Sequence, residues 1–189
     1  IAVTNVAPSA PVDGDAAADS VSEGAVNGDT VGLDANSSDV HGGAVSFSLT
    51  NDAGGRFAIN PVTGVVRVAN ASLLDFESAT SHLITVQASD GTNSTTKDFT
   101  IAVTNVAPST LVDGDATANS VSKGAANGDP VGIAVNSDDV HGGAVSFSLT
   151  NNAGGRFFIT PVGVVQVADA TLFDFSAATS HTIIVQASD

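Results

Sequence analysis

The chain repeats its own sequence at a spacing of 100 residues, and this repeat constrains its fold more than any single motif. The nine residues from Ile101 to Ser109 are identical to those from Ile1 to Ser9, and the difference between positions 101 and 1 sets the spacing. The repeat slips once, because Pro61-Val-Thr-Gly64 has become Pro161-Val-Gly163 and the spacing falls to 99 beyond this turn. About 100 residues is the size of one domain, so the sequence predicts tandem copies of a single fold.

The repeat predicts three parts of the chain. Residues 1–8 are expected to be the closing strand of a preceding repeat plus a linker, 9–105 to be repeat one, and 106–189 to be a repeat two that lacks its last strand. A sandwich without that strand exposes backbone groups and apolar side chains. One hypothesis is that the N-terminal strand of one molecule completes repeat two of another copy, giving a head-to-tail filament. The alternative is that the chain has been trimmed from a longer array.

Short alternating apolar segments, separated by turn residues, predict β-strands in each repeat. Val45, Phe47 and Leu49 alternate with serines, which places the three apolar side chains on one face of a strand. Gly64 suits a turn with positive φ, and residues 70–77 are expected to form a loop or a single helical turn. About seven strands in about 100 residues predict an all-β chain of two tandem immunoglobulin-like Greek-key sandwiches. The strands of repeat one are expected at 20–23, 30–35, 45–49, 57–59, 65–69, 83–88 and 99–103.

Composition argues against several classes of function. A formal net charge of −15 disfavours nucleic acid and anionic lipid as partners, since both require basic patches. No apolar run approaches the roughly 20 residues of a membrane span, and without cysteine there is no disulfide or thiol chemistry. The absence of Trp and Tyr argues against a carbohydrate-binding module that stacks sugars on aromatic rings. No enzyme is expected, because no substrate cleft is apparent around the acidic pair Asp75 and Glu77, and the histidines lack metal-ligand spacing.

Several short motifs in combination resemble the cadherin repeat. Val21-Ser-Glu23, Leu74-Asp-Phe-Glu77, Ala88-Ser-Asp-Gly91 and the linker from Asn105 to Pro108 resemble its calcium-binding positions. The motifs Gly-Gly-Arg-Phe and Leu-Leu-Asp-Phe-Glu are similar to those of the bacterial cadherin-like tandem repeats of very large surface adhesins. The resemblance covers essentially the whole chain. It implies a seven-stranded Greek-key sandwich, an extracellular or cell-surface location, and calcium bound between successive repeats.

The resemblance also implies a set of calcium ligands. Carboxylate and amide oxygens are the donors that this hard cation prefers. The joint between the repeats would be formed by Glu23, Asp75, Glu77, Asn105, Asp138, Asp139 and Asp189. Asp39 and Asp90 would serve the joint to a preceding repeat.

The chain departs from the family pattern in two places that affect binding. The linker after Thr104 lacks the usual acidic residues, so weak sites are expected. In repeat two, Lys123 replaces Glu23 and Ser176 replaces Glu77, so the far end of that repeat is expected to be poor in metal.

Together these features favour calcium-binding repeats that form a semi-rigid stalk or fibre of a secreted bacterial adhesin, with neighbouring repeats as partners. The alternatives are a strand-donating subunit of an extracellular filament, a calcium-independent spacer, and a carbohydrate-binding module. The arginines of Gly-Gly-Arg-Phe, Arg56 and Arg156, are expected to stabilise turns rather than to bind a ligand.

Overall fold

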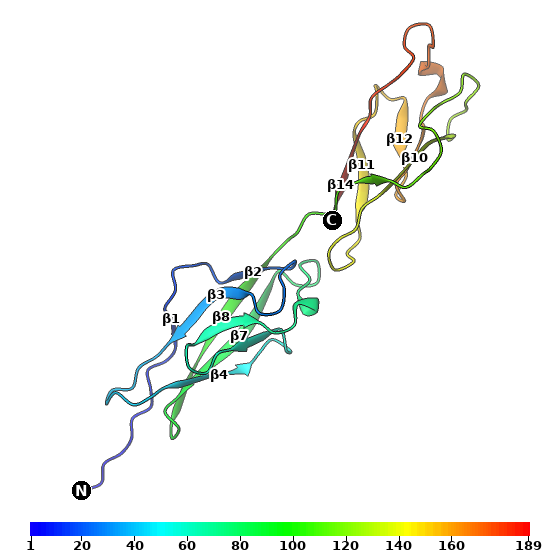
Figure 1. Cartoon of the computed structure of the whole chain (residues 1–189). Coiled ribbons are helices and arrows are strands. Elements are labelled where there is room, and N and C mark those ends of the chain that lie inside the picture. Colours follow the sequence, from blue (N-terminus) through cyan, green and yellow to red (C-terminus); the bar gives the residue numbers. More distant parts are fainter. The chain divides into compact units, whose positions relative to one another are not determined.

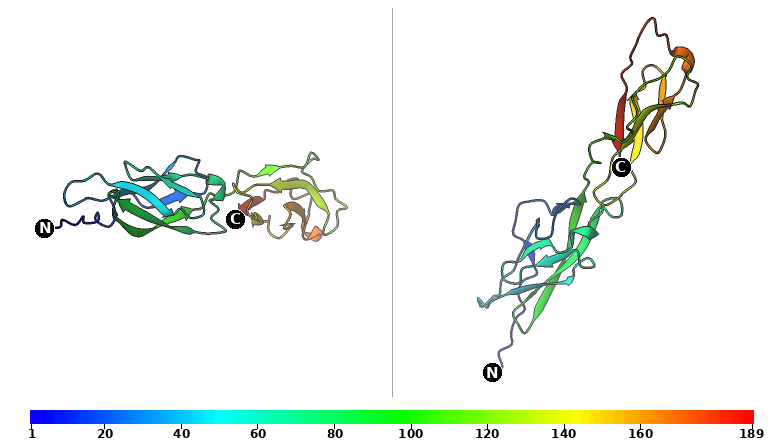
Figure 2. Two further views of the ribbon diagram at one scale, coloured as in Figure 1. Left: turned by 90° about the horizontal axis from the view of Figure 1, so that it is seen from below. Right: turned by 45° about the vertical axis from the view of Figure 1, so that its right-hand side comes forward.

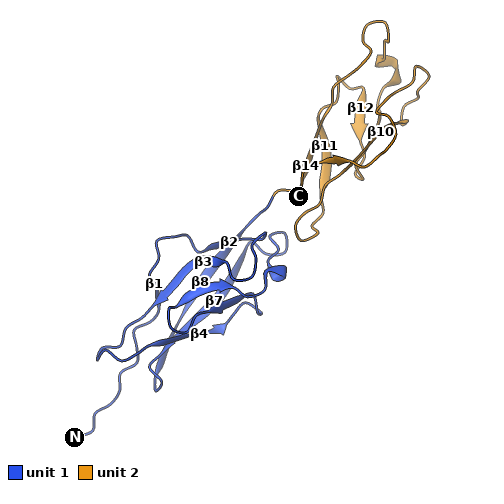
Figure 3. Ribbon diagram, in the orientation of Figure 1, with its two compact units in different colours: residues 1–106 blue, residues 107–189 orange.

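A computed structural model describes all 189 residues, which divide into two compact units, Ile1–Val106 and Ala107–Asp189 (Figure 3). Both units are built from β-strands, and each contains a single turn of 3-10 helix, η1 (Ala71–Leu73) in unit 1 and η2 (Ala170–Leu172) in unit 2. The predicted fold class, an all-β chain of two sandwiches, is therefore confirmed. No helix has the length and apolar character needed to cross a membrane.

Unit 1 packs two four-stranded sheets against each other (Figure 1). Neighbouring strands are antiparallel, except that β2 runs parallel to β8. The first sheet contains, in spatial order, β1 (Val12–Asp13), β3 (Thr30–Asn36), β6 (Val65–Val68) and β5 (Phe57–Ile59). The second contains β2 (Ser20–Ser22), β8 (Ser94–Thr104), β7 (Ser81–Ser89) and β4 (Ser46–Asn51).

The core of unit 1 follows from the period-two pattern of its strands. From Ile84 onward, every second residue of β7 is fully buried, namely Ile84, Val86 and Ala88, and the residues between them are partly exposed. The closing strand β8 contributes Ile101 and Val103, which are 0% and 3% exposed. Burying each such side chain contributes about 1.5–3 kcal/mol. The two faces predicted from alternation are therefore the faces that meet in the core.

Two turn predictions are also confirmed. Gly64 has a φ of 76°, and a Cβ atom at this position would overlap the carbonyl oxygen of Ala35. Arg56 donates from Nε to the Leu73 carbonyl at 2.9 Å and from Nη1 to the Ala53 carbonyl at 2.8 Å. The arginine thus ties the turn before β5 to η1, and the expected single helical turn in residues 70–77 is η1 itself.

Unit 2 repeats the first sheet but only half of the second. Its four-stranded sheet contains β9 (Val112–Asp113), β10 (Pro130–Asn136), β13 (Val164–Val167) and β12 (Phe157–Ile159). Its second sheet contains β11 (Ser146–Asn151) and β14 (Ile184–Ser188), which lie side by side in Figures 1 and 2. No strand of unit 2 corresponds to β2 or β8.

The first residues of the chain lie outside both sheets of unit 1. Ile1 is fully exposed and Val3 is 94% exposed, and no strand is assigned before β1. The segment first contacts the unit at Asn5, whose side-chain amide donates to Asp90 Oδ2 at 2.9 Å, and again at Ser9, whose N–H donates to the Ser38 carbonyl at 2.9 Å. The assignment of residues 1–8, 9–105 and 106–189 to successive repeats stays a prediction.

Candidate metal centre

Glu23 is the buried member of an acidic cluster in unit 1. It follows β2 directly and is 0% exposed. Two backbone amides hold its carboxylate: the Phe76 N–H donates to Oε2 at 2.9 Å, and the Val106 N–H donates to Oε1 at 2.6 Å. Glu23 therefore connects two segments that are far apart in the sequence, including the residue with which unit 1 ends.

Asp75 and Glu77 come from the loop that follows η1. The fully buried Leu74 anchors this loop in the core, and the Phe76 N–H points to Glu23, so the acidic residues on either side of Phe76 flank the same carboxylate. Asp75 is further fixed by Ser78, whose backbone N–H and hydroxyl donate to its two oxygens at 2.9 and 2.7 Å. One carboxylate oxygen from each of Glu23, Asp75 and Glu77 lies within 4.8 Å of the others.

This geometry suits a divalent cation with a preference for oxygen. Calcium takes six to eight oxygen ligands and accepts carboxylates, amide and backbone carbonyls, and water. Three carboxylates at such short range repel one another, and burying one of them raises the cost of its charge. A cation held by the cluster would remove both costs. The residues present therefore fit calcium, with the remaining ligands to come from other oxygens.

The other residues predicted for unit 1 lie in two places. Asn105 directly precedes Val106, so it is adjacent in sequence to the amide that holds Glu23. Asp39 and Asp90 are not brought to the cluster. They lie in loops that flank Ser46 and Ser89, a strand pair at one end of the second sheet.

Asp39 and Asp90 both accept hydrogen bonds from their own loops. Asp39 Oδ1 accepts the N–H of His41 at 2.8 Å. Asp90 Oδ1 accepts the N–H groups of Asn93 and Thr92, and its Oδ2 accepts the side-chain amide of Asn5 at 2.9 Å. These bonds, led by the Asn93 amide, lower the pKa of the Asp90 carboxyl and keep it charged. The observed contacts are those of turn-forming carboxylates.

In unit 2, Asp139 differs from the other predicted acids because it is only 6% exposed. Its Oδ1 accepts the N–H groups of Gly143 at 2.8 Å and His141 at 3.0 Å, whereas its buried Oδ2 has no hydrogen-bond partner. The Gly143 amide is the main cause of a lowered pKa, so the carboxyl is charged. Asp138 and Asp189 are exposed. A buried, charged oxygen without a donor is the type of atom that a cation satisfies.

The cluster of unit 1 has no counterpart in unit 2. Lys123 is exposed at the position equivalent to Glu23. Ser176, which stands where Glu77 would be, donates its backbone N–H and its hydroxyl to Asp174 Oδ1, and the hydroxyl bond is the main cause of a lowered Asp174 pKa. At this end of unit 2, two hydrogen bonds from Ser176 to Asp174 thus stand where unit 1 has the neighbouring carboxylates of Asp75 and Glu77.

The structure adds two features that side-chain motifs do not reveal. The donors that hold Glu23 are the backbone amides of Phe76 and Val106. Almost every residue has a backbone amide, so the sequence does not indicate which of them will act as donors. Asp19 is also part of the acidic surface of unit 1. Burial, followed by the nearby charges of Asp13 and Asp15, raises the pKa of its carboxyl. In unit 2 the equivalent residue is Asn119, whose side chain donates to Asp113.

Comparison with known proteins agrees with this arrangement. Residues 19–106 match the family described as the cadherin domain. The chain resembles the structure of Drosophila N-cadherin EC1-4 with a TM-score of 0.52 and 18% identity, over 97% of this chain and 45% of that one. It resembles human protocadherin-24 EC1-2 (Form II) with a TM-score of 0.52 and 20% identity, over 97% and 95% of the two chains. No curated protein matches.

At these identities the structural matches show the fold, whereas the family match covers the acidic cluster of unit 1. Cadherin domains are extracellular, non-enzymatic adhesion modules, which agrees with the expectation for this chain. Residues 19–106 of unit 1 therefore resemble the cadherin domain, and unit 2 repeats most of the sequence of unit 1.

Proposed function

We propose that the chain is a pair of calcium-binding cadherin repeats that contributes to a semi-rigid stalk or fibre of a secreted bacterial adhesin. The observation that carries this proposal is the cluster of Glu23, Asp75 and Glu77, with oxygens within 4.8 Å of one another. The bacterial source and the adhesin role rest on the resemblance of the repeat's sequence motifs to those of large surface adhesins.

The cluster is joined directly to the linker of unit 1. Glu23 Oε1 accepts the N–H of Val106, the residue with which unit 1 ends. Anything that fixes the Glu23 carboxylate therefore also fixes the direction in which the backbone leaves the unit. Asp75 and Glu77 would hold the ion from the other side, and Asn105 lies one residue from the anchored amide.

Unit 2 would complete the ligand set with Asp138, Asp139 and Asp189. The partnerless Oδ2 of Asp139 supports this assignment, because a buried carboxylate oxygen needs either a donor or a cation. Bound calcium would supply the positive charge that neutralises these carboxylates. With acids of both units tied to one charge, a flexible joint becomes stiff, and a tandem array of such joints extends in proportion to its number of repeats.

Calcium titration of two matched variants tests the proposal. Glu77→Ala removes a carboxylate of the cluster, whereas Asp174→Ala removes the one carboxylate in the equivalent loop of unit 2, where no cluster exists. We expect binding in the range of about 0.1–1 mM for the unmodified chain and for Asp174→Ala, measured by calorimetry, and much weaker binding for Glu77→Ala.

Small-angle scattering in calcium and in chelator tests the mechanical part. A narrower distribution of dimensions in calcium is expected if the joint stiffens. Equal heats of calcium binding for all three proteins would show that the cluster does not bind the ion. Identical scattering in both buffers would favour the calcium-independent spacer.

A further inference from the structure

Ser109, at the start of unit 2, is held to the rest of that unit by three hydrogen bonds. Its backbone N–H donates to the Asp138 carbonyl at 2.8 Å, and its hydroxyl oxygen accepts the Asp138 N–H at 2.8 Å. The Ser137 hydroxyl donates to the Ser109 carbonyl at 2.5 Å. We call this set of bonds the serine clamp. Because it engages the N–H, the carbonyl and the hydroxyl of Ser109, it fixes both the position and the direction of the backbone there.

Unit 1 has the same serine clamp at the equivalent place. The Ser9 N–H donates to the Ser38 carbonyl at 2.9 Å, and the Ser38 N–H donates to Ser9 Oγ at 3.1 Å. The Ser37 hydroxyl donates to the Ser9 carbonyl at 2.6 Å. Ser38 contributes only backbone groups, so its replacement by Asp138 in unit 2 leaves the pattern intact. The clamp is therefore a feature of the repeat and depends on two serine hydroxyls.

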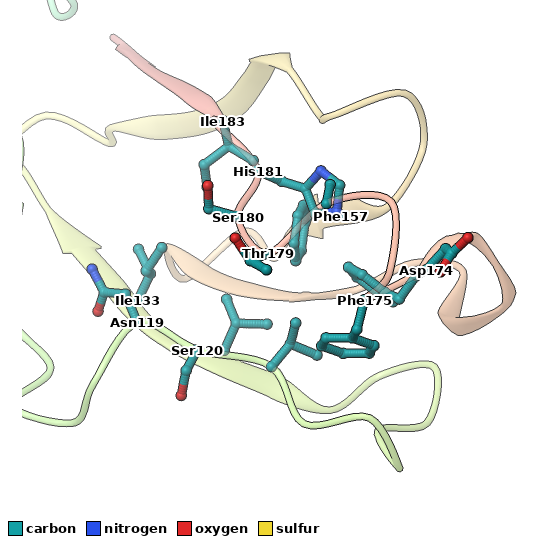
Figure 4. Close-up of a pocket in the computed structure, with 14 residues that line it drawn as sticks. Asn119, Ser120, Ile133, Phe157, Asp174, Phe175, Thr179, Ser180, His181 and Ile183 are labelled. Carbon is teal, nitrogen blue, oxygen red and sulfur yellow. The ribbon is translucent and has the colours of Figure 1, made fainter.

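The complete sheet of unit 2 supports its clamp. Ser137 directly follows β10, whose last residue, Asn136, pairs with Val112 of β9. Unit 2 also contains a cavity of about 370 Å³, which is lined by other residues, among them Phe157 and His181 (Figure 4). No residue of the clamp lines this cavity. The clamp is therefore independent of the part of unit 2 where the cavity lies.

The last residue of unit 1 is also anchored. The Val106 N–H donates to Oε1 of the buried Glu23 at 2.6 Å. Only residues 107 and 108, an alanine and a proline, lie between this anchored amide and Ser109. The chain that is free to bend between the two anchors is therefore very short.

Ala107 and Pro108 themselves have little conformational freedom. The pyrrolidine ring of a proline fixes its φ near about −65°. The residue before a proline is sterically restricted to extended conformations. Both restrictions are covalent or steric, so neither of them requires a bound ion.

We infer that the serine clamp, together with Pro108, restricts the joint between the two units when no metal ion is bound. The clamp fixes the end of the linker on unit 2, and the Val106 amide fixes its start on unit 1. The calcium of the proposed function would then act on a joint that already has few free torsions. The inference itself rests on contacts within each unit and does not require the calcium site.

Distance distributions between spin labels on the two units, measured in chelator, test the inference independently of calcium binding. The chain has no cysteine, so Ser48→Cys and Ser148→Cys, at exposed positions of β4 and β11, place one label on each unit. The test variant is Ser109→Ala with Ser137→Ala, which removes two of the three bonds of the clamp. Each lost bond should change the equilibrium about 2- to 10-fold, so the population with a released linker should rise about tenfold or more.

The matched control is Ser9→Ala with Ser37→Ala, which removes the same groups from the clamp of unit 1. We expect a narrow distance distribution for the unmodified chain and for the control, and a broader one for the test variant. Equal widths for all three proteins, or equal broadening in control and test variant, would overturn the inference.

Two further measurements examine the linker and the clamp separately. Pro108→Gly changes only a linker residue outside the strands, and it should broaden the distribution because glycine releases φ. Hydrogen exchange of the Asp138 amide, which donates to Ser109 Oγ, should be slow in the unmodified chain and faster in the test variant. An Asp138 amide that exchanges equally fast in both proteins would show that the clamp is not formed in solution.

Discussion

Glu77→Gln should stabilise unit 1 without calcium and remove most of its response to calcium. Glu77 is exposed, and its carboxylate lies within 4.8 Å of those of Glu23 and Asp75. At this distance Coulomb repulsion is about 1 kcal/mol per pair at the permittivity of water and about 3.5 kcal/mol at an effective permittivity near 20. Exposure and salt favour the lower value, so removing two pairs should raise the free energy of unfolding in chelator by about 1–2 kcal/mol.

Calcium should reduce the difference in the free energy of unfolding between Glu77→Gln and the unmodified chain, because it stabilises the unmodified chain more. At ten times a dissociation constant of about 0.5 mM, bound calcium stabilises the unmodified chain by about 1.4 kcal/mol. This corresponds to a rise of about 5–10 °C in the unfolding temperature of unit 1. If the variant binds about 100-fold more weakly, the same calcium contributes about 0.1 kcal/mol. The advantage of Glu77→Gln in chelator should therefore largely disappear in calcium.

The assay is thermal unfolding of both proteins in chelator and in about 5 mM calcium. This concentration exceeds the dissociation constants of about 0.1–1 mM that are typical of extracellular calcium sites. Asp98→Asn is the matched control, because it removes one negative charge from β8, where the Asp98 carboxylate accepts the Thr85 hydroxyl at 2.7 Å. The control should respond to calcium as the unmodified chain does. A calcium response of equal size in Glu77→Gln and Asp98→Asn would refute the electrostatic reasoning.

Three further predictions concern unit 1. Gly64→Ala should destabilise it by about 1–3 kcal/mol in denaturant unfolding, because the residue has a φ of 76° and a Cβ would overlap the Ala35 carbonyl. Asp19→Asn should stabilise it at pH 7 by a few tenths to about 1 kcal/mol, since burial and the nearby acids raise the Asp19 pKa. A folded pKa above the unfolded value of 3.8 means that stability falls as pH rises through this window, so the benefit should vanish below pH 3.8. Burial, with a smaller effect of Arg56, lowers the pKa of His82 below 6.5, so unit 1 should lose stability as pH falls through 6.5. His82→Gln should reduce that loss, measured as unfolding temperature between pH 7.5 and 5.5.

Much of the fold could be predicted because its strands alternate strictly. The buried sets of β4, β7 and β8 are the apolar residues of period-two segments, and Gly64 is required by a turn that only glycine tolerates. Strand β1 could not be predicted, since Val12–Asp13 follows two prolines and is too short to show a period. The parallel pairing of β2 with β8 joins residues about 80 positions apart, and no local pattern specifies it.

The cluster was only partly accessible from the sequence. Asp75 and Glu77 stand in one motif, so their proximity follows from local spacing. The burial of Glu23 depends on the Phe76 and Val106 amides, which belong to distant segments. The Ser-Val-Ser segments at 20–22 and 120–122 make the same point, because identical residues form a strand in unit 1 and none in unit 2. Strand formation here depends on the partner as well as on the residues.

The parallel pairing of β2 with β8 has a consequence for a unit under tension. The backbone enters β2 near the start of unit 1 and leaves through β8 at its end. A force applied at the two ends of the unit pulls parallel neighbours past each other along their own direction. Their evenly spaced hydrogen bonds then share the load and must break together, whereas an antiparallel hairpin would open one bond at a time. The parallel pairing of β2 with β8 should therefore make unit 1 resistant to unfolding by a force applied at its two ends.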